Sequence, residues 1–199
     1  LEAQHGTEIN GNMFYLAKEL ATNEAYSSYT VYMTCRPGNK KKFEETFEAY
    51  GIEGINLLIL STKAYMKVLA SAKYLVNNNT FLPFYVKKEG QVYLNTWHGT
   101  PLKTLGKKIQ NAMHNIGNAQ KNFIVADYLL YPNEYTMEHM VEDYMLENIA
   151  EGKALLAGYP RNVAFFDRES EARIRETLEL TDKKVKLSEE LSKLESALK

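Results

Sequence analysis

The chain has 199 residues, enough to bury the core of one domain, and 45% of them are hydrophobic. This composition excludes a disordered protein, and a formal net charge of −1 argues neither for nor against nucleic acid. The single cysteine, Cys35, excludes an internal disulfide, fits a reducing compartment and, because it flanks an apolar run, is predicted to be a buried thiol. No window approaches the ~20 apolar residues that cross a bilayer, so we expect a protein that is soluble or lies against a membrane.

Short apolar runs that are typical of β-strands alternate with helix-like segments. Strands are predicted at residues 29–33, 56–60, 74–76, 92–97, 128–131 and 154–158. The run at 56–60 is almost continuously apolar, as expected of a strand buried on both faces. Leu1-Glu2-Ala3 reads as the end of a further strand, which suggests that the chain is a fragment.

Helices are predicted between these strands. They span about residues 13–22 with Asn12 as the cap, about 40–50, a segment capped by Ser61 or Thr62, and about 133–146. In the last of these, methionine and aromatic residues recur at helical spacing and are expected in the core. The alternation predicts βαβ units, and therefore an α/β fold with a Rossmann-like parallel sheet and helices on both faces.

The tail from about Asp167 is charged and helical in pattern. Its leucines form a seam of under two heptads, at Leu187, Leu191, Leu194 and Leu198. This seam predicts a C-terminal amphipathic helix, which either docks on its own domain or joins copies of the chain into a homo-oligomer.

The segment from Asn95 to Lys103 carries the residues most suited to chemistry. His98 follows a predicted strand, and open parallel sheets bind ligands beyond the carboxyl ends of their strands. Gly99 allows a tight turn and a close approach of the backbone to a ligand. Thr100 is expected to cap a following helix, whose first turn would hold Pro101.

A helix start at this place would form an anion site, to which Lys103 adds a positive charge. The cations are expected to lower the pKa of His98 and so favour its neutral, basic form. The pattern therefore favours phosphate chemistry. The alternative is a core histidine bonded to a carbonyl, next to an ordinary helix start.

The stretch between Glu89 and Asp127 contains no acidic residue. It contains several basic ones, namely Lys103, Lys107, Lys108, Lys121, His98 and His114. This distribution suggests an anionic ligand or an anionic membrane surface, or else a solvated helix face. Nucleic acid is not expected as a partner, because stacking aromatic residues are not interleaved with the lysines.

Other candidates are weaker. His5 follows the first strand and either faces the same cleft or is a loop residue, while His114 and His139 are expected at the surface. Arg161, in the turn at 158–162, either binds phosphate or forms part of a hinge. No residues have the spacing of metal ligands, and the sequence contains no dinucleotide-binding, Walker or nucleophile-elbow motif, so neither a metal nor a cofactor is expected.

The run from Thr96 to Lys103 resembles the signature of the CDP-glycerol:poly(glycerophosphate) glycerophosphotransferases, and the likeness continues through Lys107. Gly11-Asn12 and the segments at 126–134 and 158–162 agree with the family in the same order, over about residues 2–185. The chain departs from the family at Val163, where an aspartate is usual, and near Lys108, where one is frequent. The apolar strand that should follow residues 181–185 does not continue.

The resemblance implies the amino-terminal half of a GT-B fold, in which two Rossmann-like domains face each other across a cleft. Residues 1–180 would form this acceptor-side domain, and residues 181–199 a helix that is non-native or belongs to a truncated second domain. The implied acceptor is undecaprenyl-linked, at the cytoplasmic face of the membrane. The donor, CDP-glycerol or CDP-ribitol, would bind mainly to the second domain, so the chain is expected to be inactive alone.

The resemblance also implies roles for individual residues in teichoic acid or capsule synthesis. His98 would act as the general base, and Gly99, Thr100, Lys103, Trp97, Asn12 and Arg161 would contact substrate. Two alternatives stay open: a glycosyltransferase of the same architecture that uses a sugar nucleotide, and a non-catalytic module that binds the acceptor or oligomerises.

Overall fold

A computed structural model describes residues 1–110, 116–149 and 152–177. The chain divides into two compact units, Leu1–Arg161 and Asn162–Lys199. The expected boundary at residue 180 and the leucine seam lie outside the described residues, so both stay predictions.

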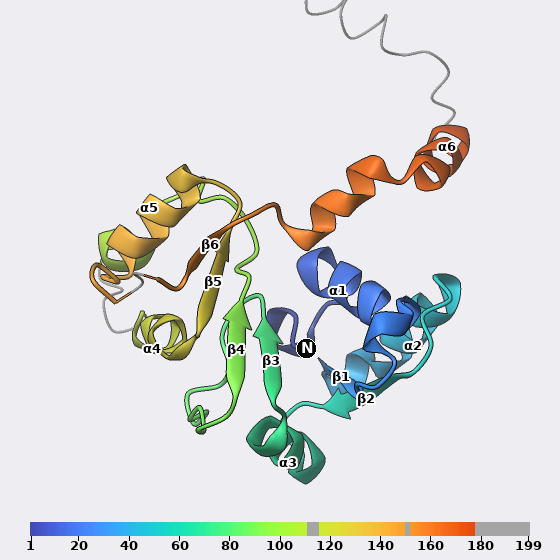
Figure 1. Cartoon of the computed structure of the whole chain (residues 1–199), viewed down its shortest axis with the longest axis horizontal. Coiled ribbons are helices and arrows are strands. Elements are labelled where there is room, and N and C mark those ends of the chain that lie inside the picture. Colours follow the sequence, from blue (N-terminus) through green and yellow to red (C-terminus); the bar gives the residue numbers. More distant parts are fainter. Residues whose placement is uncertain (111–115, 150–151, 178–199) are drawn as a thin grey trace, which may run out of the picture. The chain divides into compact units, whose positions relative to one another are not determined.

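Strands and helices alternate along most of the first unit, as predicted, but the strands at 74–77 and 92–95 follow each other with no helix between them (Figure 1). The strands are β1 Val31–Cys35, β2 Ile55–Ile59, β3 Tyr74–Asn77, β4 Val92–Asn95, β5 Tyr128–Tyr131 and β6 Ala154–Leu156. The α-helices are α1 Gly11–Thr22, α2 Lys40–Ala49, α3 Lys63–Ser71, α4 Gly117–Val125, α5 Glu134–Asp143 and, in the second unit, α6 Arg168–Thr177. Short 3-10 turns include η1 Gln4–Gly6, η4 Gly106–Lys108 and η6 Pro160–Phe166.

Residues Leu1–Ala3 join two groups of parallel strands. β1 pairs with β2, β3 to β6 pair in chain order, and Glu2 bridges Thr34 of β1 and Asn77 of β3. Thr34 donates its N–H to the Leu1 carbonyl at 2.9 Å, and Glu2 donates its N–H to the Val76 carbonyl at 2.9 Å. The order across the sheet is therefore β2-β1-(Leu1–Ala3)-β3-β4-β5-β6. The interpretation of Leu1–Ala3 as part of a strand is confirmed.

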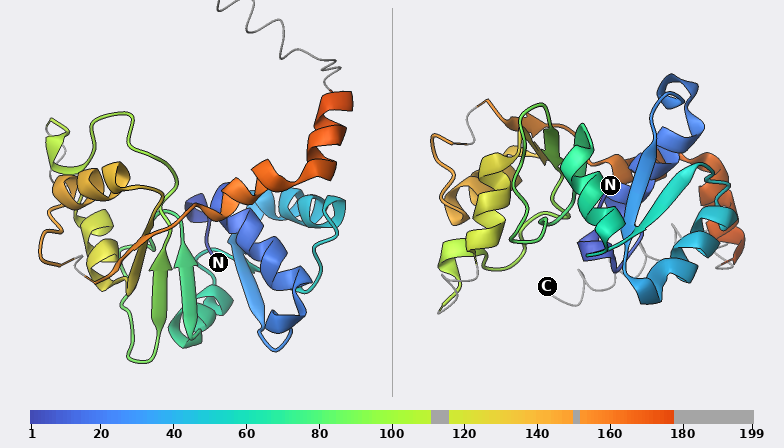
Figure 2. Two further views of the ribbon diagram at one scale, coloured as in Figure 1. Left: turned by 45° about the horizontal axis from the view of Figure 1, so that its top comes forward. Right: turned by 90° about the horizontal axis from the view of Figure 1, so that it is seen from below.

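This order makes the chain wind outwards to β2 and then return past its start to β6. Because crossovers between parallel strands are right-handed, the two directions of winding place helices on opposite faces of the sheet. One apolar core joins α1 and α2 to β1, with Met13, Met33 and Phe43 fully buried. The other joins α3, α4 and α5 to β3–β5, around Tyr93 and Phe123 (Figures 1 and 2). The predicted α/β class is confirmed.

Two local predictions are confirmed, the helix cap at Thr62 and the buried thiol of Cys35. Thr62 caps α3 by accepting a hydrogen bond from the Tyr65 N–H at 3.2 Å. Asn133 caps α5 in the same way, through the Thr136 N–H at 2.8 Å. Cys35 is a buried free thiol. Within the described residues, no helix has the length and apolarity needed to cross a membrane.

Other local predictions are wrong. Asn12 lies inside the first turn of α1, whose cap position is Asn10. β2 is only half-buried, because it lies at the edge of the sheet and not between two strands. The strand predicted at 29–33 begins and ends two residues later, since Leu1–Ala3 pairs with the later part of that run.

Candidate functional site

The candidate site lies where the winding of the sheet reverses, between Leu1–Ala3 and β3. At such a switch point the loops after two neighbouring strands lead away from each other and leave a crevice at the carboxyl ends. The turn η1 follows Leu1–Ala3, residues Asn78 and Asn79 follow β3, and Thr96–Gly99 follow β4. The sequence therefore placed His98 at the correct edge of the sheet.

His98 is half-buried and held by a single backbone group. Its Nδ1 lies 2.8 Å from the Asn78 carbonyl oxygen. A carbonyl oxygen only accepts hydrogen bonds, so Nδ1 carries the proton and, in the neutral ring, Nε2 is the unprotonated nitrogen. The carbonyl bond named in the alternative interpretation is thus present, yet it prepares Nε2 to accept a proton.

Burial is the main cause that lowers the pKa of His98 below its ordinary value. The hydrogen bond to Asn78 acts in the opposite direction, and the charges of Arg161 and then Lys103 lower the pKa further. The pKa direction expected from the sequence is confirmed, although burial outweighs the cationic neighbours. The neutral, basic form of the ring is therefore favoured at neutral pH.

The indole ring of Trp97 packs against the imidazole ring of His98. The indole is buried, and its ring centroid lies 4.0 Å from that of His98 at an interplanar angle of 32°. Its other neighbours are Phe123 and Tyr144, at centroid distances of 5.6 and 6.1 Å. Trp97 also has a φ of +49°, a left-handed conformation that few non-glycine residues adopt. These contacts favour a role in orienting His98 over direct contact with substrate.

Asn12 connects three segments beneath the site. Its Nδ2 donates to the Thr96 hydroxyl at 3.3 Å and to the Trp97 carbonyl at 3.2 Å, and its Oδ1 accepts from the Arg161 N–H at 3.4 Å. The residue is 2% exposed. Burial and occupied hydrogen-bonding groups favour Asn12 as a residue that positions the loop, not one that touches substrate.

Arg161 brings a positive charge to the same loop. Its Nη1 donates to the His98 carbonyl at 3.0 Å, and the guanidinium lies over the Tyr159 ring at 5.0 Å. No further bond from this guanidinium is found among the described residues. Its remaining N–H groups are therefore free to meet an anionic ligand in this part of the chain.

The helix expected to begin at Thr100 is absent. Residues 96–105 are non-helical, and the next turn is η4 at Gly106–Lys108. Pro101 disfavours helical backbone at Thr100, and the hydroxyl of Thr100 accepts a long bond, 3.4 Å, from that of Thr136 and caps nothing. Lys103 is an exposed residue of an extended segment, so the predicted helix-start anion site does not exist there.

Gly99 also differs from the expectation. The left-handed residue of the turn is Trp97, and a Cβ added to Gly99 would meet no atom within 4 Å. Open space at Gly99 is compatible with the approach of a ligand, but the turn itself does not require a glycine at this position.

Two lysines of the predicted basic field are paired with carboxylates that lie outside the stretch in which the field was counted, and a third is bonded to backbone carbonyls. Lys108 lies 3.0 Å from Glu142 and 2.9 Å from Asp143, and Lys107 lies 3.9 Å from Glu142. Lys121 donates to the carbonyls of Pro83 and Tyr85. Among the described residues no ion pair involves Lys103, which with Arg161 supplies the positive charge near His98.

The residue that sequence reasoning missed is Asn78. It is 3% exposed, its carbonyl holds His98, and its side-chain Oδ1 accepts the Gln4 N–H at 2.9 Å. It therefore ties η1, which contains His5, to the loop of His98. The signal was the run Asn77-Asn78-Asn79 directly after a strand, since polar residues at a strand end are suited to shaping a site.

The remaining candidates have simpler positions. The Nδ1 of His5 lies 3.9 Å from the buried Glu2 carboxylate, and the Nδ1 of His139 lies 2.9 Å from the Tyr135 carbonyl within α5. His114 lies outside the described residues. In the part of the chain that the structure describes, no cluster of metal-ligating side chains is found.

The chain is similar to several known proteins. The family model described as CDP-glycerol:poly(glycerophosphate) glycerophosphotransferase matches residues 1–187. The teichoic acid poly(glycerol phosphate) polymerase of Bacillus subtilis is 32% identical over 147 residues, which are 70% of this chain and 18% of that protein. The teichoic acid glycerol-phosphate transferase of Staphylococcus aureus is 31% identical over 133 residues, 63% of this chain and 32% of that one.

Among solved structures, a variant of the wall teichoic acid polymerase TagF matches with a TM-score of 0.73 at 24% identity. The match covers 91% of this chain and 43% of that one, so the chain spans less than half the length of each of these proteins. The likeness confirms the fold, and it fits the prediction of the amino-terminal half of a GT-B architecture.

Proposed function

The chain belongs to the CDP-glycerol:poly(glycerophosphate) glycerophosphotransferase family, and from this premise we propose that it forms the acceptor-side half of an enzyme that transfers a polyol phosphate. The donor would be CDP-glycerol or CDP-ribitol, and the acceptor a lipid-linked polyol phosphate. A teichoic acid or a related polymer would be the product. The two relatives named above are called a teichoic acid polymerase and a teichoic acid glycerol-phosphate transferase. One structure of TagF was obtained after a soak with CDPG.

The observation that carries the proposal is the bond between His98 Nδ1 and the Asn78 carbonyl. It leaves Nε2 as the nitrogen that accepts a proton in a half-buried ring with a lowered pKa. A terminal hydroxyl of the acceptor attacks the phosphorus that bears the polyol, and its proton passes to Nε2. The bridging P–O bond of the donor breaks, and CMP leaves with the bonding electron pair.

Arg161 takes the electrostatic role that the sequence assigned to a helix start. Its guanidinium is fixed 3.0 Å from the His98 carbonyl, close to the base, where negative charge develops on the transferred phosphate. Lys103 adds a second, more exposed positive charge. Trp97 and Asn12 orient the loop, and the space at Gly99 and Thr100 receives the acceptor.

The first test is release of CMP from CDP-glycerol in the presence of a lipid-linked acceptor. This chain is compared with a version extended by a second, donor-binding domain, because we propose that the donor binds mainly there. Activity is expected only in the extended version. In that version His98→Ala is expected to reduce turnover by about 10²–10⁴-fold, as for the loss of a positioned base.

His139→Ala is the matched control, because His139 bonds within its own helix and lies on α5. It is expected to leave turnover unchanged. An extended enzyme that keeps more than half of its activity after His98→Ala would refute the assignment of the base. If no cytidine donor releases CMP but a UDP-sugar is consumed, the sugar-nucleotide alternative replaces the proposal.

A peripheral position at the cytoplasmic face of the membrane belongs to the proposal, since the acceptor is lipid-linked. The described lysines give it limited electrostatic support. Lys40 and Lys41 lie 3.4 Å from Glu44 and Glu45, in pairs along α2. Binding to anionic vesicles is therefore expected to exceed binding to neutral vesicles only modestly, which co-sedimentation measures.

A further inference from the structure

A second group of polar side chains lies at the carboxyl edge of the sheet, on the other side of Asn78 from His98. Arg36 follows β1, and His5 lies in the turn η1 that follows Leu1–Ala3. Neighbouring strands lie about 4.8 Å apart, and β3 lies between, so roughly 10 Å separates the chain segments that carry His5 and His98. A small ligand at the switch point is therefore within reach of side chains from both segments.

The turn η1 holds His5 in an uncommon backbone conformation. Gln4, His5 and Gly6 have φ values of +44°, +53° and +70°, so three left-handed residues follow one another. Gly6 packs directly against the end of β1, where an added Cβ would lie 2.9 Å from the Cα of Cys35. Its carbonyl accepts the Arg36 N–H at 2.8 Å. Strained backbone that is held in place by its neighbours is concentrated at functional sites.

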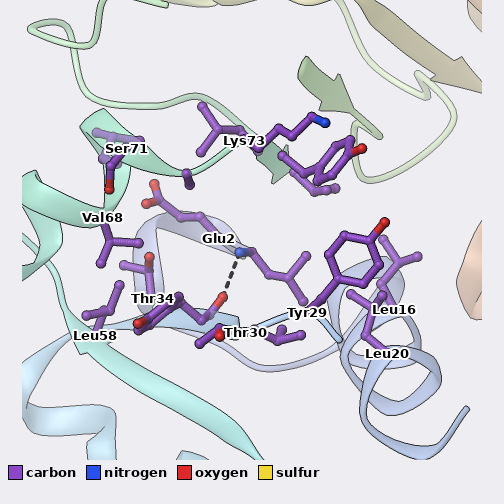
Figure 3. A pocket seen from close by; sticks show the side chains of 18 of the residues that line it. Glu2, Leu16, Leu20, Tyr29, Thr30, Thr34, Leu58, Val68, Ser71 and Lys73 are labelled. Atoms are coloured by element: carbon purple, nitrogen blue, oxygen red, sulfur yellow. Dashed lines mark hydrogen bonds between the residues drawn. The ribbon is translucent and has the colours of Figure 1, made fainter. Parts of the chain in front are cut away.

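The imidazole of His5 has one buried nitrogen and one open edge. Its Nδ1 is buried, makes no hydrogen bond within the described residues and lies 3.9 Å from the Glu2 carboxylate. That carboxylate accepts the Tyr65 hydroxyl at 3.0 Å, and Glu2 also borders the apolar groove between β1 and β3 (Figure 3). Because a carboxylate only accepts, the proton of the neutral ring is favoured on Nδ1, and Nε2 is then an acceptor. The side chain is 30% exposed, so its outer edge, with Nε2, is open to a ligand.

The guanidinium of Arg36 supplies the positive charge on this side of the crevice. Its Nε donates to the His5 carbonyl at 3.3 Å, which fixes the group beside the turn. The side chain is exposed, and in the described part of the chain no ion pair or further hydrogen bond of this guanidinium is found. Its remaining N–H groups are suited to the paired oxygens of a phosphate.

Together the two side chains select a class of ligand. Arg36 only donates, and its charge favours an anion, whereas Nε2 of the neutral His5 ring accepts from a hydroxyl. Inorganic phosphate would satisfy mainly the arginine, and an uncharged polyol only the histidine. The ligand that matches both is an anion that also carries hydroxyl groups, as a polyol phosphate does.

We propose that Arg36 and His5 form a second subsite, which binds the terminal polyol phosphate of the acceptor. Arg36 contacts its phosphate, and His5 accepts from a hydroxyl other than the one that attacks. The attacking hydroxyl of the same polyol then lies towards His98, on the other side of Asn78. This inference rests on the proposed function, which supplies the acceptor, and it assigns the residues that select the end of that acceptor.

The first test measures binding to this chain in the absence of a donor. Glycerol phosphate is titrated into the chain, and the ring nitrogen NMR signals of His5 report contact at Nε2. We expect the His5 Nε2 signal to shift, and Arg36→Gln to weaken the affinity about tenfold through the loss of a charge-assisted hydrogen bond. Arg168→Gln is the matched control, because Arg168 pairs with Glu171 in the second unit, and it is expected to leave the affinity unchanged.

The second variant, His5→Asn, tests the contact with the hydroxyl. Asparagine tolerates left-handed backbone, so the turn is expected to keep its shape, which circular dichroism and the melting temperature verify. The affinity for glycerol phosphate is expected to fall about fivefold and that for inorganic phosphate to stay the same. An unchanged affinity in Arg36→Gln would overturn the proposal, as would an undiminished preference for glycerol phosphate over inorganic phosphate in His5→Asn.

The enzyme extended by the second domain separates this proposal from the proposed function. There Arg36→Gln is expected to raise the KM of the acceptor about tenfold, while kcat falls far less than in His98→Ala. If no donor releases CMP, the proposed function fails, and the binding experiment still decides the subsite. If CMP is released but Arg36→Gln leaves the KM of the acceptor unchanged, the subsite alone is refuted.

Discussion

The two ends of the sheet are completed in different ways. At the carboxyl ends of the strands, polar side chains such as Asn12, Asn78 and Arg161 bond to backbone groups of neighbouring loops. At the amino ends, between β1 and β3, the walls are apolar and their backbone edges face a groove. The difference shows that the candidate site is held in shape by the chain's own hydrogen bonds, whereas the groove at the amino ends is lined mainly by apolar side chains.

The largest loss of stability is expected from Gly106→Ala. Gly106 lies after the extended segment that follows His98, where the chain packs against Asp143 at the end of α5. Gly106 has a φ of +53°, and an added Cβ would lie 1.9 Å from the Asp143 carbonyl oxygen. Strain and displacement together are expected to cost about 3 kcal/mol or more, measured by urea unfolding.

Gly51→Ala is the control for this change. Gly51 has a φ of +61°, but an added Cβ would meet no atom within 4 Å, so only the backbone strain of about 1–2 kcal/mol applies. Equal losses in the two variants would show that the contact between Gly106 and Asp143 is not what holds the loop.

A somewhat smaller loss is expected from Asn12→Ala, which removes the central link of the polar end. It leaves the Arg161 N–H without its partner and removes one of the two donors to the Trp97 carbonyl, which keeps the Thr96 hydroxyl, at a cost of about 2–3 kcal/mol. Asn10→Ala is the matched control, because Asn10 is exposed and makes no side-chain cap bond. A loss below that of the control would mean that the loop is held from elsewhere.

The sequence predicted those parts of the molecule that local patterns determine. The strand at 128–131 was placed correctly, because an apolar run ends at Pro132. Thr62 was recognised as a cap from its position before an apolar helix. His98 was placed at the carboxyl edge because it directly follows a strand.

What the sequence did not predict depends on residues far apart in the chain. The segment after Gly99 has the local features of a helix start, but its ends are fixed by Asn12 and by α5, and it stays extended. The lysines of 103–121 were counted as a basic field because Glu142 and Asp143 lie beyond that stretch. The bond from Asn78 to His98 crosses 20 positions and has no local pattern.

Stability is expected to rise with pH below about 6.5, the ordinary pKa of histidine, because burial lowers the pKa of His98. The ring binds a proton more readily in the unfolded chain, so protonation favours unfolding below that value, and the penalty fades as pH rises.

Urea unfolding at pH 5 and pH 7 measures this dependence. The part that comes from the ring is expected to disappear with His98→Gln. An unchanged pH dependence in that variant would show that His98 is not the group that titrates.

The smallest effect is expected from Lys103→Gln, which leaves both ends of the sheet folded. Removing a positive charge stabilises the protonated ring of His98, so the pKa rises and the acid limb of the activity profile moves to higher pH. Arg161→Gln is expected to move it further, because Arg161 contributes more to the lowered pKa and also bonds the His98 carbonyl.

Salt separates the two variants, provided that the enzyme carrying the second domain is used. Lys103 is exposed, so its effect acts through solvent and is expected to vanish at 1 M salt, where the screening length is about 3 Å. The effect of Arg161→Gln is expected to persist there, because the guanidinium is partly buried and acts at 3.0 Å from the loop. Equal salt sensitivity of the two shifts would mean that Arg161 acts only as a distant charge, and that the shape of the loop owes nothing to its bond with His98.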